Sequence, residues 1–310
     1  MVSKMANKIS VFGSLNMDQV AKVDRFPRPG ETLKGKDYFS APGGKGANQA
    51  VAASRLGAEV SMFGLIGEDV FGEELISELE KDGVDVGFLE RRSCSTGLAL
   101  IQVDKSGENQ IVIIPGANGK VDNNYVDKSL EKILETDVLL LQLEIPIGAI
   151  NYLLNRLGSE AESAPAVILD PAPASPLRQF NLNPVDYLIP NEGELGGLLE
   201  DEKTRDLKPE LLDLGVNTVI VTKGSEGASY FSERESFSVP GFSVEVEDTT
   251  AAGDAFAGAM AVGIAEGENP RDVIKFANAA GGLAAASSGA QPSLPSREEV
   301  EKFLKRRGGY

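Results

Sequence analysis

Short apolar runs alternate with amphipathic stretches of helical length along almost all of this 310-residue sequence, and this alternation limits the fold more than any other pattern in it. The apolar runs are residues 9–12, 60–66, 138–143, 166–169, 187–189 and 218–221, and the helical stretches are 48–56, 69–81, 125–134, 147–157 and 192–199. Apolar runs separated by helices are typical of parallel strands that are buried on both faces. The sequence therefore predicts an α/β fold of three layers, with a central, mostly parallel sheet flanked by helices.

Two stretches, at about 18–41 and 96–114, interrupt the alternation. The first contains no good helix, and the second predicts a hairpin with strands at 98–103 and 110–114. We expect both to form a small β-sheet lid that projects from the main sheet or pairs with another chain. The alternative is two surface excursions with no common role. Because no repeat or linker indicates a second unit, we predict one domain over 8–310.

Composition excludes several kinds of site and partner. Forty-seven acidic residues against 30 basic ones give a net charge of -17, which opposes binding to nucleic acid or anionic membranes. The absence of histidine and the single Cys94 exclude Ser-His-Asp triads, His-ligated metals, disulfides within the chain and cysteine-rich zinc sites. No apolar run is long enough to span a membrane, and residues 1–7 lack a signal-peptide pattern, so we expect a cytoplasmic protein.

Residues 247–256 combine small side chains with a carboxylate at the start of a predicted helix, 255–265. A β-rich stretch at 242–246 leads into them. Small residues at a helix start leave N–H groups open to an anion, which the helix dipole also favours. Asp254 beside such an anion-binding helix start could accept a proton from a hydroxyl during phosphoryl transfer. In the alternative, which the spacing supports equally, Asp254 only caps the helix.

Polar or Gly-rich segments also follow several predicted strands. Ligands of open α/β sheets bind at the carboxyl ends of the strands, so these segments predict a shared site, although each residue alone could be a cap or turn residue. The segment 43–48 matches neither a Walker A loop nor a dinucleotide fingerprint, and its alternative is a tight turn with a solvated lysine. The other candidates are Asn16, Asp18, Glu144, Asn191, Glu194 and residues 222–227, of which Asn191 and Glu194 could reach a hydrated Mg²⁺.

The segments GSLNMD, GGKGANQAVAASRLGA, LLQLE, DPAPA, PNEGE, DTTAAGDAF and GAQPSLP follow one another along the chain. Their order and approximate spacing resemble the ribokinase branch of the PfkB carbohydrate kinase family, over essentially the whole sequence. Several motifs in order are far more specific than one Gly-rich loop. Many family members have Gly where this chain has Ala251, but Ala is common there within this branch.

The resemblance implies a ribokinase-like fold and an ATP-dependent sugar kinase that phosphorylates the 5-hydroxyl of a pentose, with D-ribose as the expected sugar. It implies that Asp254 is the catalytic base and that the N–H groups of Ala251, Ala252 and Gly253 bind the γ-phosphate. The implied sugar-binding residues are Asn16, Met17, Asp18, Gly44, Lys45, Gly46, Ala47, Asn48, Glu144 and Asp254. Met17 is included only because it lies between two of them.

The implied ATP-binding residues are Asn191, Glu194, Thr222, Lys223, Gly224, Ser225, Glu226, Gly227, Gly253, Asp254 and Asn278, with Glu194 in a motif associated with Mg²⁺. The resemblance also implies a K⁺ site made by Asp248, Thr250, Ala284, Ser287, Gly289 and Ser293, partly through backbone carbonyls. Oxygen ligands suit such a hard cation. It further implies a homodimer that forms through the β lid.

Three alternatives to this function stay open. One is the same reaction on 2-deoxyribose, adenosine or another pentose, because motifs do not reveal a difference of one hydroxyl between substrates. Another is a non-catalytic sugar or nucleotide sensor on the same fold, although the residues of the implied base and anion hole are intact. A nucleotide-dependent dehydrogenase is disfavoured by the missing fingerprint.

Overall fold

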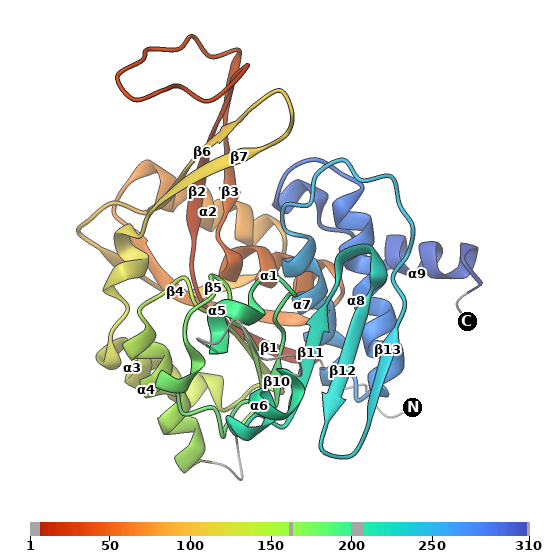
Figure 1. The fold of residues 1–310 in the computed structure, drawn as a ribbon. Helices are drawn as coiled ribbons and strands as arrows, with labels where there is room; N and C mark the ends of the chain where they lie inside the picture. Colours follow the sequence, from red (N-terminus) through yellow and green to blue (C-terminus); the bar gives the residue numbers. More distant parts are fainter. Residues whose placement is uncertain (1–6, 161–163, 200–206, 309–310) are drawn as a thin grey trace.

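A computed structural model describes residues 7–160, 164–199 and 207–308 of the chain (Figure 1). Residues 1–6, which contributed to the expectation about signal peptides, lie outside this part. Among the residues described, no helix combines the length and the apolar character that crossing a membrane would require.

Within the described residues, a nine-stranded sheet forms the centre of the molecule. Its strands, in the order in which they lie side by side, are β13 (Ser236–Val239), β12 (Ala228–Ser232), β11 (Thr218–Thr222), β10 (Tyr187–Leu188), β9 (Ala166–Asp170), β8 (Val138–Gln142), β1 (Lys8–Phe12), β4 (Glu59–Gly67) and β5 (Asp85–Arg92). Neighbours from β11 to β5 are parallel, and only the two pairs that involve β12 are antiparallel. The predicted mostly parallel sheet is therefore confirmed.

Helices cover both faces of this sheet because its inner strands are apolar on both sides. In β8, Val138 and Leu140 belong to one buried core, and Leu139 and Leu141 belong to the other. One face is covered by α1 (Lys45–Arg55), α2 (Val70–Lys81), α7 (Ala252–Ala265), α8 (Pro270–Ala285) and α9 (Arg297–Arg306), and the other by α3 (Asn123–Ile133), α4 (Ile147–Ser159), α5 (Leu195–Leu199) and α6 (Leu207–Asp213). The three-layer α/β prediction is confirmed.

The two predicted excursions come together in a second, four-stranded sheet that projects from the main body (Figure 1). Its strands, in order, are β3 (Asp37–Gly43), β2 (Asn16–Lys22), β6 (Gly97–Val103) and β7 (Asn109–Ile114). The β6–β7 hairpin has the predicted turn, in which Asp104 accepts hydrogen bonds from the backbone N–H groups of Ser106 and Glu108. The expectation of unrelated excursions is wrong, since β2 pairs with both β3 and β6.

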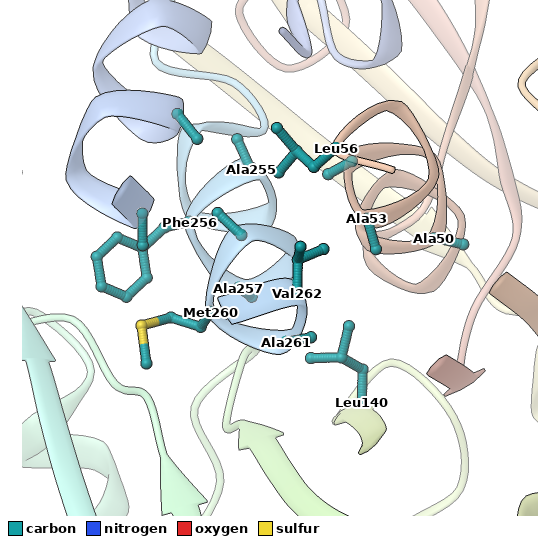
Figure 2. Close-up of a cluster of buried hydrophobic side chains, with 14 of the residues drawn as sticks. Ala50, Ala53, Leu56, Leu140, Ala255, Phe256, Ala257, Met260, Ala261 and Val262 are labelled. Atoms are coloured by element: carbon teal, nitrogen blue, oxygen red, sulfur yellow. The ribbon is translucent and has the colours of Figure 1, made fainter. Parts of the chain in front are cut away.

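Helices α1 and α7 lie against each other because small residues line the surfaces where they meet. Figure 2 shows Ala53 of α1 facing Val262 of α7, with Leu140 of β8 beside Ala261. A Cβ atom on Gly258 of α7 would lie 2.7 Å from the Cβ of Ala52, so the two backbones approach closely. This close packing brings the N-terminal ends of both helices to the same edge of the sheet.

Some predicted boundaries differ from the structure. Residues 242–246 do not form a strand; the backbone N–H of Glu247 donates instead to the carbonyl oxygen of Ala285, and Phe242 packs edge-to-face on Phe303. Helix α1 begins at Lys45 rather than at Asn48, and α5 begins at Leu195 because Asn191 and Glu194 form a turn before it.

Candidate active site

The polar segments predicted from strand ends meet at the carboxyl edge of the main sheet, at the base of the small sheet. The chain leaves β1, enters β2 and later returns through β3 into α1. Gly44 is the residue before α1 and has a φ of 89°, and a Cβ atom there would lie 2.7 Å from the backbone nitrogen of Asn16. A glycine is therefore required for the start of α1 to lie against the start of β2.

Glu144, which follows β8, holds the start of α1 in place. Its Oε2 atom accepts hydrogen bonds from the hydroxyl of Ser14 at 2.5 Å and from the backbone N–H of Lys45 at 3.0 Å. A carboxylate is favourable at this position because the first N–H groups of a helix have no partners within the helix. Glu144 therefore joins the ends of β1, β8 and α1.

The carboxylate of Asp254 is buried between α7 and α1, with 5% of the residue exposed. It accepts hydrogen bonds from Asn48 Nδ2 at 3.0 Å and from Gln49 Nε2 at 3.1 Å, and Lys45 Nζ lies 3.6 Å away. The residue at the N-cap position of α7 is Ala251, and no side chain caps the helix there. The interpretation of Asp254 as a simple helix cap is therefore wrong, and the hydrogen-bond donors to its carboxylate come from α1.

A second carboxylate, Asp170 at the end of β9, shares these donors. Its Oδ2 atom accepts from Gln49 Nε2 at 2.8 Å and from Lys45 Nζ at 3.2 Å. Burial raises the pKa of Asp170 to about 6, and the nearby charge of Lys45 limits the rise. Burial alone would lower the pKa of Lys45, but Asp170, Asp254 and Glu144 together raise it above its usual value, so the lysine stays charged.

Asp18 on β2 faces the same group of acids. Burial raises its pKa from 3.8 to about 7, and the negative charges of Glu144 and Asp254 add to the rise. Asp18 also lies close against Gly43 of the neighbouring strand β3. Asp170, Asp254 and Glu144 therefore lie around one lysine, and Asp18 lies near two of them, an arrangement suited to a ligand that supplies several hydroxyl donors.

Asn16, the first residue of β2, is held by Asn118, which is 1% exposed and follows the β6–β7 hairpin. Asn118 Nδ2 donates to Asn16 Oδ1 at 2.8 Å and to the carbonyl of Leu15 at 2.9 Å, and its Oδ1 accepts from the N–H of Leu15 at 3.0 Å. Since the oxygen of the Asn16 amide accepts from Asn118, its amino group is left for another partner.

Three predicted sugar-binding residues do not present a side chain to this group of acids. Met17 is fully buried in the hydrophobic core, because alternate residues of a strand face opposite sides. Gly46 and Ala47 pack on the turn after β1, where the N–H of Ala47 donates to the carbonyl of Ser14 at 3.0 Å. A Cβ on Gly46 would lie 2.6 Å from the backbone nitrogen of Ser14, so these two residues serve close packing.

The start of α7 is open, as the sequence predicts. Gly253 is exposed, and a Cβ atom there would meet no atom within 4 Å. Ala251 adopts a left-handed conformation with a φ of 59°, and the N–H of Ala252 donates to Thr249 at the long distance of 3.3 Å. Small residues at an open helix start provide a binding place for an anionic group next to Asp254.

The predicted nucleotide-binding segments lie next to one another beyond β10 and β11. The N–H of Asn191 donates to Glu194 at 2.8 Å, the N–H of Glu194 donates back to Asn191 at 2.9 Å, and Asn191 forms a β-bridge with Thr222. Residues 224–227 form a tight turn against the chain after β13. Asn278 on α8 donates to the carbonyls of Val239 and Pro240, so its amino group holds this chain segment.

The predicted cation-binding residues come from two segments that the fold brings together beside the start of α7. Asp248 accepts hydrogen bonds from the N–H of Thr250 and from the N–H of Gly289, both at 2.9 Å. Burial alone would raise the pKa of Asp248, but the hydrogen bond from the Thr250 hydroxyl, together with these two backbone hydrogen bonds, outweighs it and lowers the pKa. Ala284 and Ser293 lie on the second segment, where Ser293 donates to the carbonyl of Ala290 and Ser287 donates its N–H to Ala284.

The residues predicted to bind a cation offer oxygen atoms as ligands. The described residues contain no group of three or more Asp, Glu, Cys or His side chains that could hold a metal ion. The carboxylate of Asp248 with nearby hydroxyl and carbonyl oxygens is the kind of oxygen-rich set that hard cations prefer. Mg²⁺ would arrive with a nucleotide, with several of its ligands supplied by phosphate and water.

Sequence reasoning missed Asp170, Gln49 and Asn118 as members of the site. Asp170 directly follows the predicted strand 166–169, as Glu144 follows 138–143, so the rule that selected Glu144 applies to it as well. Gln49 follows Asn48 in a helix, and no pattern marks it as the bridge between two carboxylates. Asn118 lies about a hundred residues from its partners, and only the fold brings them together.

The arrangement places a buried carboxylate beside an open helix start, with hydroxyl-binding groups on one side and the nucleotide segments on the other. A carboxylate so placed can accept a proton from a bound hydroxyl, while the helix start stabilises charge on a transferring phosphoryl group. The geometry therefore suits transfer of a phosphoryl group to a sugar hydroxyl.

Comparison with known proteins agrees with this chemistry. Residues 6–297 match the model of the pfkB family carbohydrate kinases. A ribokinase from Bacillus subtilis (strain 168) is 40% identical over 297 residues, which cover 96% of this chain and 99% of that protein. The structure of a ribokinase from Thermotoga maritima matches with a TM-score of 0.86 at 40% identity, covering 96% of this chain and 99% of that one.

The structure of Arabidopsis thaliana ribokinase complexed with ribose and ATP matches with a TM-score of 0.89 at 33% identity, covering 97% of this chain and 99% of that one. The family model and the full-length relatives lead to the same conclusion: this chain belongs to the pfkB family of carbohydrate kinases.

Proposed function

We propose that this protein is a ribokinase, which transfers the γ-phosphoryl group of ATP to the 5-hydroxyl of D-ribose. The observation that carries the proposal is the buried carboxylate of Asp254, held by Asn48 and Gln49 beside the open start of α7. The similarity to ribokinases over nearly the full length of both chains supports ribose as the sugar.

In this proposal, Asp254 accepts the proton of the 5-hydroxyl while the N–H groups of Ala251, Ala252 and Gly253 bind the γ-phosphate. Asn16, Asp18, Gly44, Lys45, Asn48 and Glu144 hold the sugar through its other hydroxyls. Lys45 is suited to this task because three carboxylates keep it charged. Asn191, Glu194, residues 222–227 and Asn278 lie along ATP, and Mg²⁺ bound to ATP neutralises charge on its phosphates.

The local positive charge of this site offsets an unfavourable overall charge. A chain with a net charge of -17 repels ATP at long range. Lys45, the start of α7, the Mg²⁺ on the nucleotide and a bound K⁺ supply the attraction at short range. For the same reason the proposal includes neither nucleic acid nor membrane as a partner, and it places the enzyme in the cytoplasm, where ATP is available.

The substrate and the role of Asp254 are tested by measuring ADP release from Mg-ATP in the presence of K⁺ and one of four compounds: ribose, 2-deoxyribose, fructose or adenosine. We expect the turnover rate with ribose to exceed that with the other compounds. We expect Asp254→Asn to lower kcat by about 10²-fold or more while sparing ATP binding. Turnover highest on another sugar would reassign the substrate. No ADP release with any of these compounds, from a protein that still binds ATP, would favour the non-catalytic sensor.

We also propose that K⁺ activates the enzyme from the site around Asp248, Thr250, Ala284, Ser287, Gly289 and Ser293. The ion would set the shape of the segment that leads into α7 without touching the sugar. We expect turnover to rise with K⁺ more than with Na⁺, and Asp248→Asn to remove the difference. A rate that does not depend on which ion is present would contradict the site.

The exposed apolar surface of the small sheet supports the proposed homodimer. Ile111, Val112 and Ile113 on β7 are exposed by 50%, 61% and 48%, and Leu100 on β6 is exposed by 44%. Exposed apolar strands of this kind are commonly covered by another chain. We expect a dimer in sedimentation analysis and a monomer for Ile113→Asp; the matched control Lys105→Asp, in the turn of the same hairpin, should stay dimeric.

A further inference from the structure

We propose that Asp170 is a positioning residue for Asp254: it holds Lys45 away from the base, so that the ammonium does not block the approach of the sugar hydroxyl to Asp254. This inference rests on the proposed function, because it assumes that Asp254 accepts a proton from the substrate. It assigns a task to a buried carboxylate that the proposed reaction does not otherwise use.

The first observation is that Asp170 and Asp254 share the same two donors, and each donor lies nearer to Asp170. Gln49 Nε2 is 2.8 Å from Asp170 and 3.1 Å from Asp254. Lys45 Nζ is 3.2 Å from Asp170 and 3.6 Å from Asp254. Asp170 is 6% exposed, so water does not replace these interactions. Asp170 therefore competes with Asp254 for both donors, and it is the nearer acceptor for Lys45.

The second observation is that a hydrogen bond from Gln142 to the amide oxygen of Gln49 fixes the orientation of this amide. Gln142 at the end of β8 is fully buried, and its Nε2 donates to Gln49 Oε1 at 2.6 Å. Because the oxygen of Gln49 is engaged in this way, its amino group must face the two carboxylates. The chain from Gln142 through Gln49 thus delivers one donor to both acids and leaves no freedom to turn the amide.

The consequence follows from electrostatics at short range. Without the negative charge of Asp170, the ammonium of Lys45 would be attracted mainly by Asp254 and Glu144 and would move towards the base. A closer ammonium stabilises the ionised form of Asp254 and makes it a weaker proton acceptor. It would also crowd Oδ1 of Asp254, which already accepts a hydrogen bond from Gln49. Asp170 therefore keeps the ammonium of Lys45 away from the base.

The test is Asp170→Asn, which keeps the shape of the side chain and removes its charge. We expect kcat to fall by about 10-fold, a part of the 10²–10⁴-fold that general bases contribute, with little change in KM for ATP. The acidic limb of the kcat/KM profile should move to lower pH, because one negative charge beside the base is lost. The other charged groups that face this pair stay in place: Lys45, Asp18, Glu144 and Glu194.

A second variant gives a shift of opposite sign. Gln49→Met removes the shared amide donor and leaves both carboxylates and the lysine, so the acidic limb should move to higher pH. The matched control is Asp186→Asn, which removes a carboxylate that accepts a hydrogen bond from Val167, near the opposite end of β9. This control should leave the acidic limb where it is in the parent enzyme.

The outcomes separate this inference from the proposed function. If Asp254→Asn keeps near-normal turnover, the proposed base is wrong. If Asp254→Asn is inactive but Asp170→Asn has a kcat within 2-fold of the parent and the same acidic limb, Asp170 does not position the base. A fall in kcat with an unmoved acidic limb in both Asp170→Asn and Gln49→Met would show a purely structural role and would also overturn the inference.

Discussion

Replacing Asp18 by Asn should make the free protein more stable and its complex with sugar weaker. Asp18 is surrounded by Glu144 and Asp254, and burial with these charges raises its pKa from 3.8 to about 7. Keeping this carboxylate ionised at neutral pH therefore lowers the stability of the free protein. Asn has nearly the same shape and carries no charge, so the substitution removes the cost and leaves the packing of β2 unchanged.

The direction of the pH dependence follows from proton binding. Between about pH 4 and pH 7 the folded protein keeps the proton of Asp18 while the unfolded chain has lost it. The free energy of unfolding therefore falls as pH rises through this window. Above about pH 7 the titration of Asp18 causes no further change. At about 1.4 kcal/mol per pKa unit, a rise from 3.8 to about 7 corresponds to about 4 kcal/mol at pH 8.

Sugar binding should act in the opposite direction. Hydroxyl donors from a sugar stabilise the ionised carboxylate, so the sugar lowers the pKa of Asp18 and binds better as pH rises towards 8. Asn cannot accept with the strength of a carboxylate, and a hydrogen bond to a charged group is worth about 1.5–3 kcal/mol. We therefore expect Asp18→Asn to weaken ribose binding by about 10–100-fold.

The assay is urea unfolding of the ligand-free protein from pH 5 to pH 8, together with calorimetric titration of ribose. Asp37→Asn, on the exposed part of the neighbouring strand β3, is the matched control. The parent should lose stability across this range relative to Asp18→Asn, and the variant should be the more stable protein at pH 8. A variant that is less stable than the parent at pH 8 would refute the reasoning.

Substitutions at three further positions test the surroundings of the site. Arg55→Ala should lower the free energy of unfolding by about 2–3 kcal/mol in urea titrations, because Arg55 binds Asp82 and two carbonyls near Ser293; a loss below about 0.5 kcal/mol would contradict this. Ala251→Val should cost at least about 1 kcal/mol at its left-handed φ, whereas Ala251→Gly should change stability by less than that. Asn118→Asp should raise KM for ribose about 10-fold without changing KM for ATP, since the carboxylate cannot donate to Asn16; equal effects on both constants would argue against this contact.

The fold was largely predictable because its signal is local and repeated. The apolar runs that became β4, β8, β9 and β11 are buried on both faces, which a sequence shows directly. Residues 242–246 carry the same β-rich composition but have no neighbouring strand to pair with. Composition alone could not distinguish these two situations, because pairing depends on what the fold places alongside.

The site was predictable where a residue type and its place in the chain both carry information. Asp254 and Glu144 combine a carboxylate with a helix start or a strand end, and the structure brings them to one place. Met17 was included by adjacency alone, and the alternation of strand residues turns it into the core. Gln49 and Asn118 act through hydrogen bonds to distant segments, and such contacts leave no trace in a single sequence.

Helix α1 connects two parts of the site that a sequence would treat as separate. Lys45 and Gln49 reach the carboxylates from its first turns, and Arg55 at its other end binds the carbonyls of Gln291 and Leu294. A single inserted or deleted residue in a helix turns everything beyond it by about 100° and shifts it by about 1.5 Å. Length variation among descendants of this protein should therefore be absent from these 11 residues, while the turn between β6 and β7, which touches neither end, is free to grow or shrink.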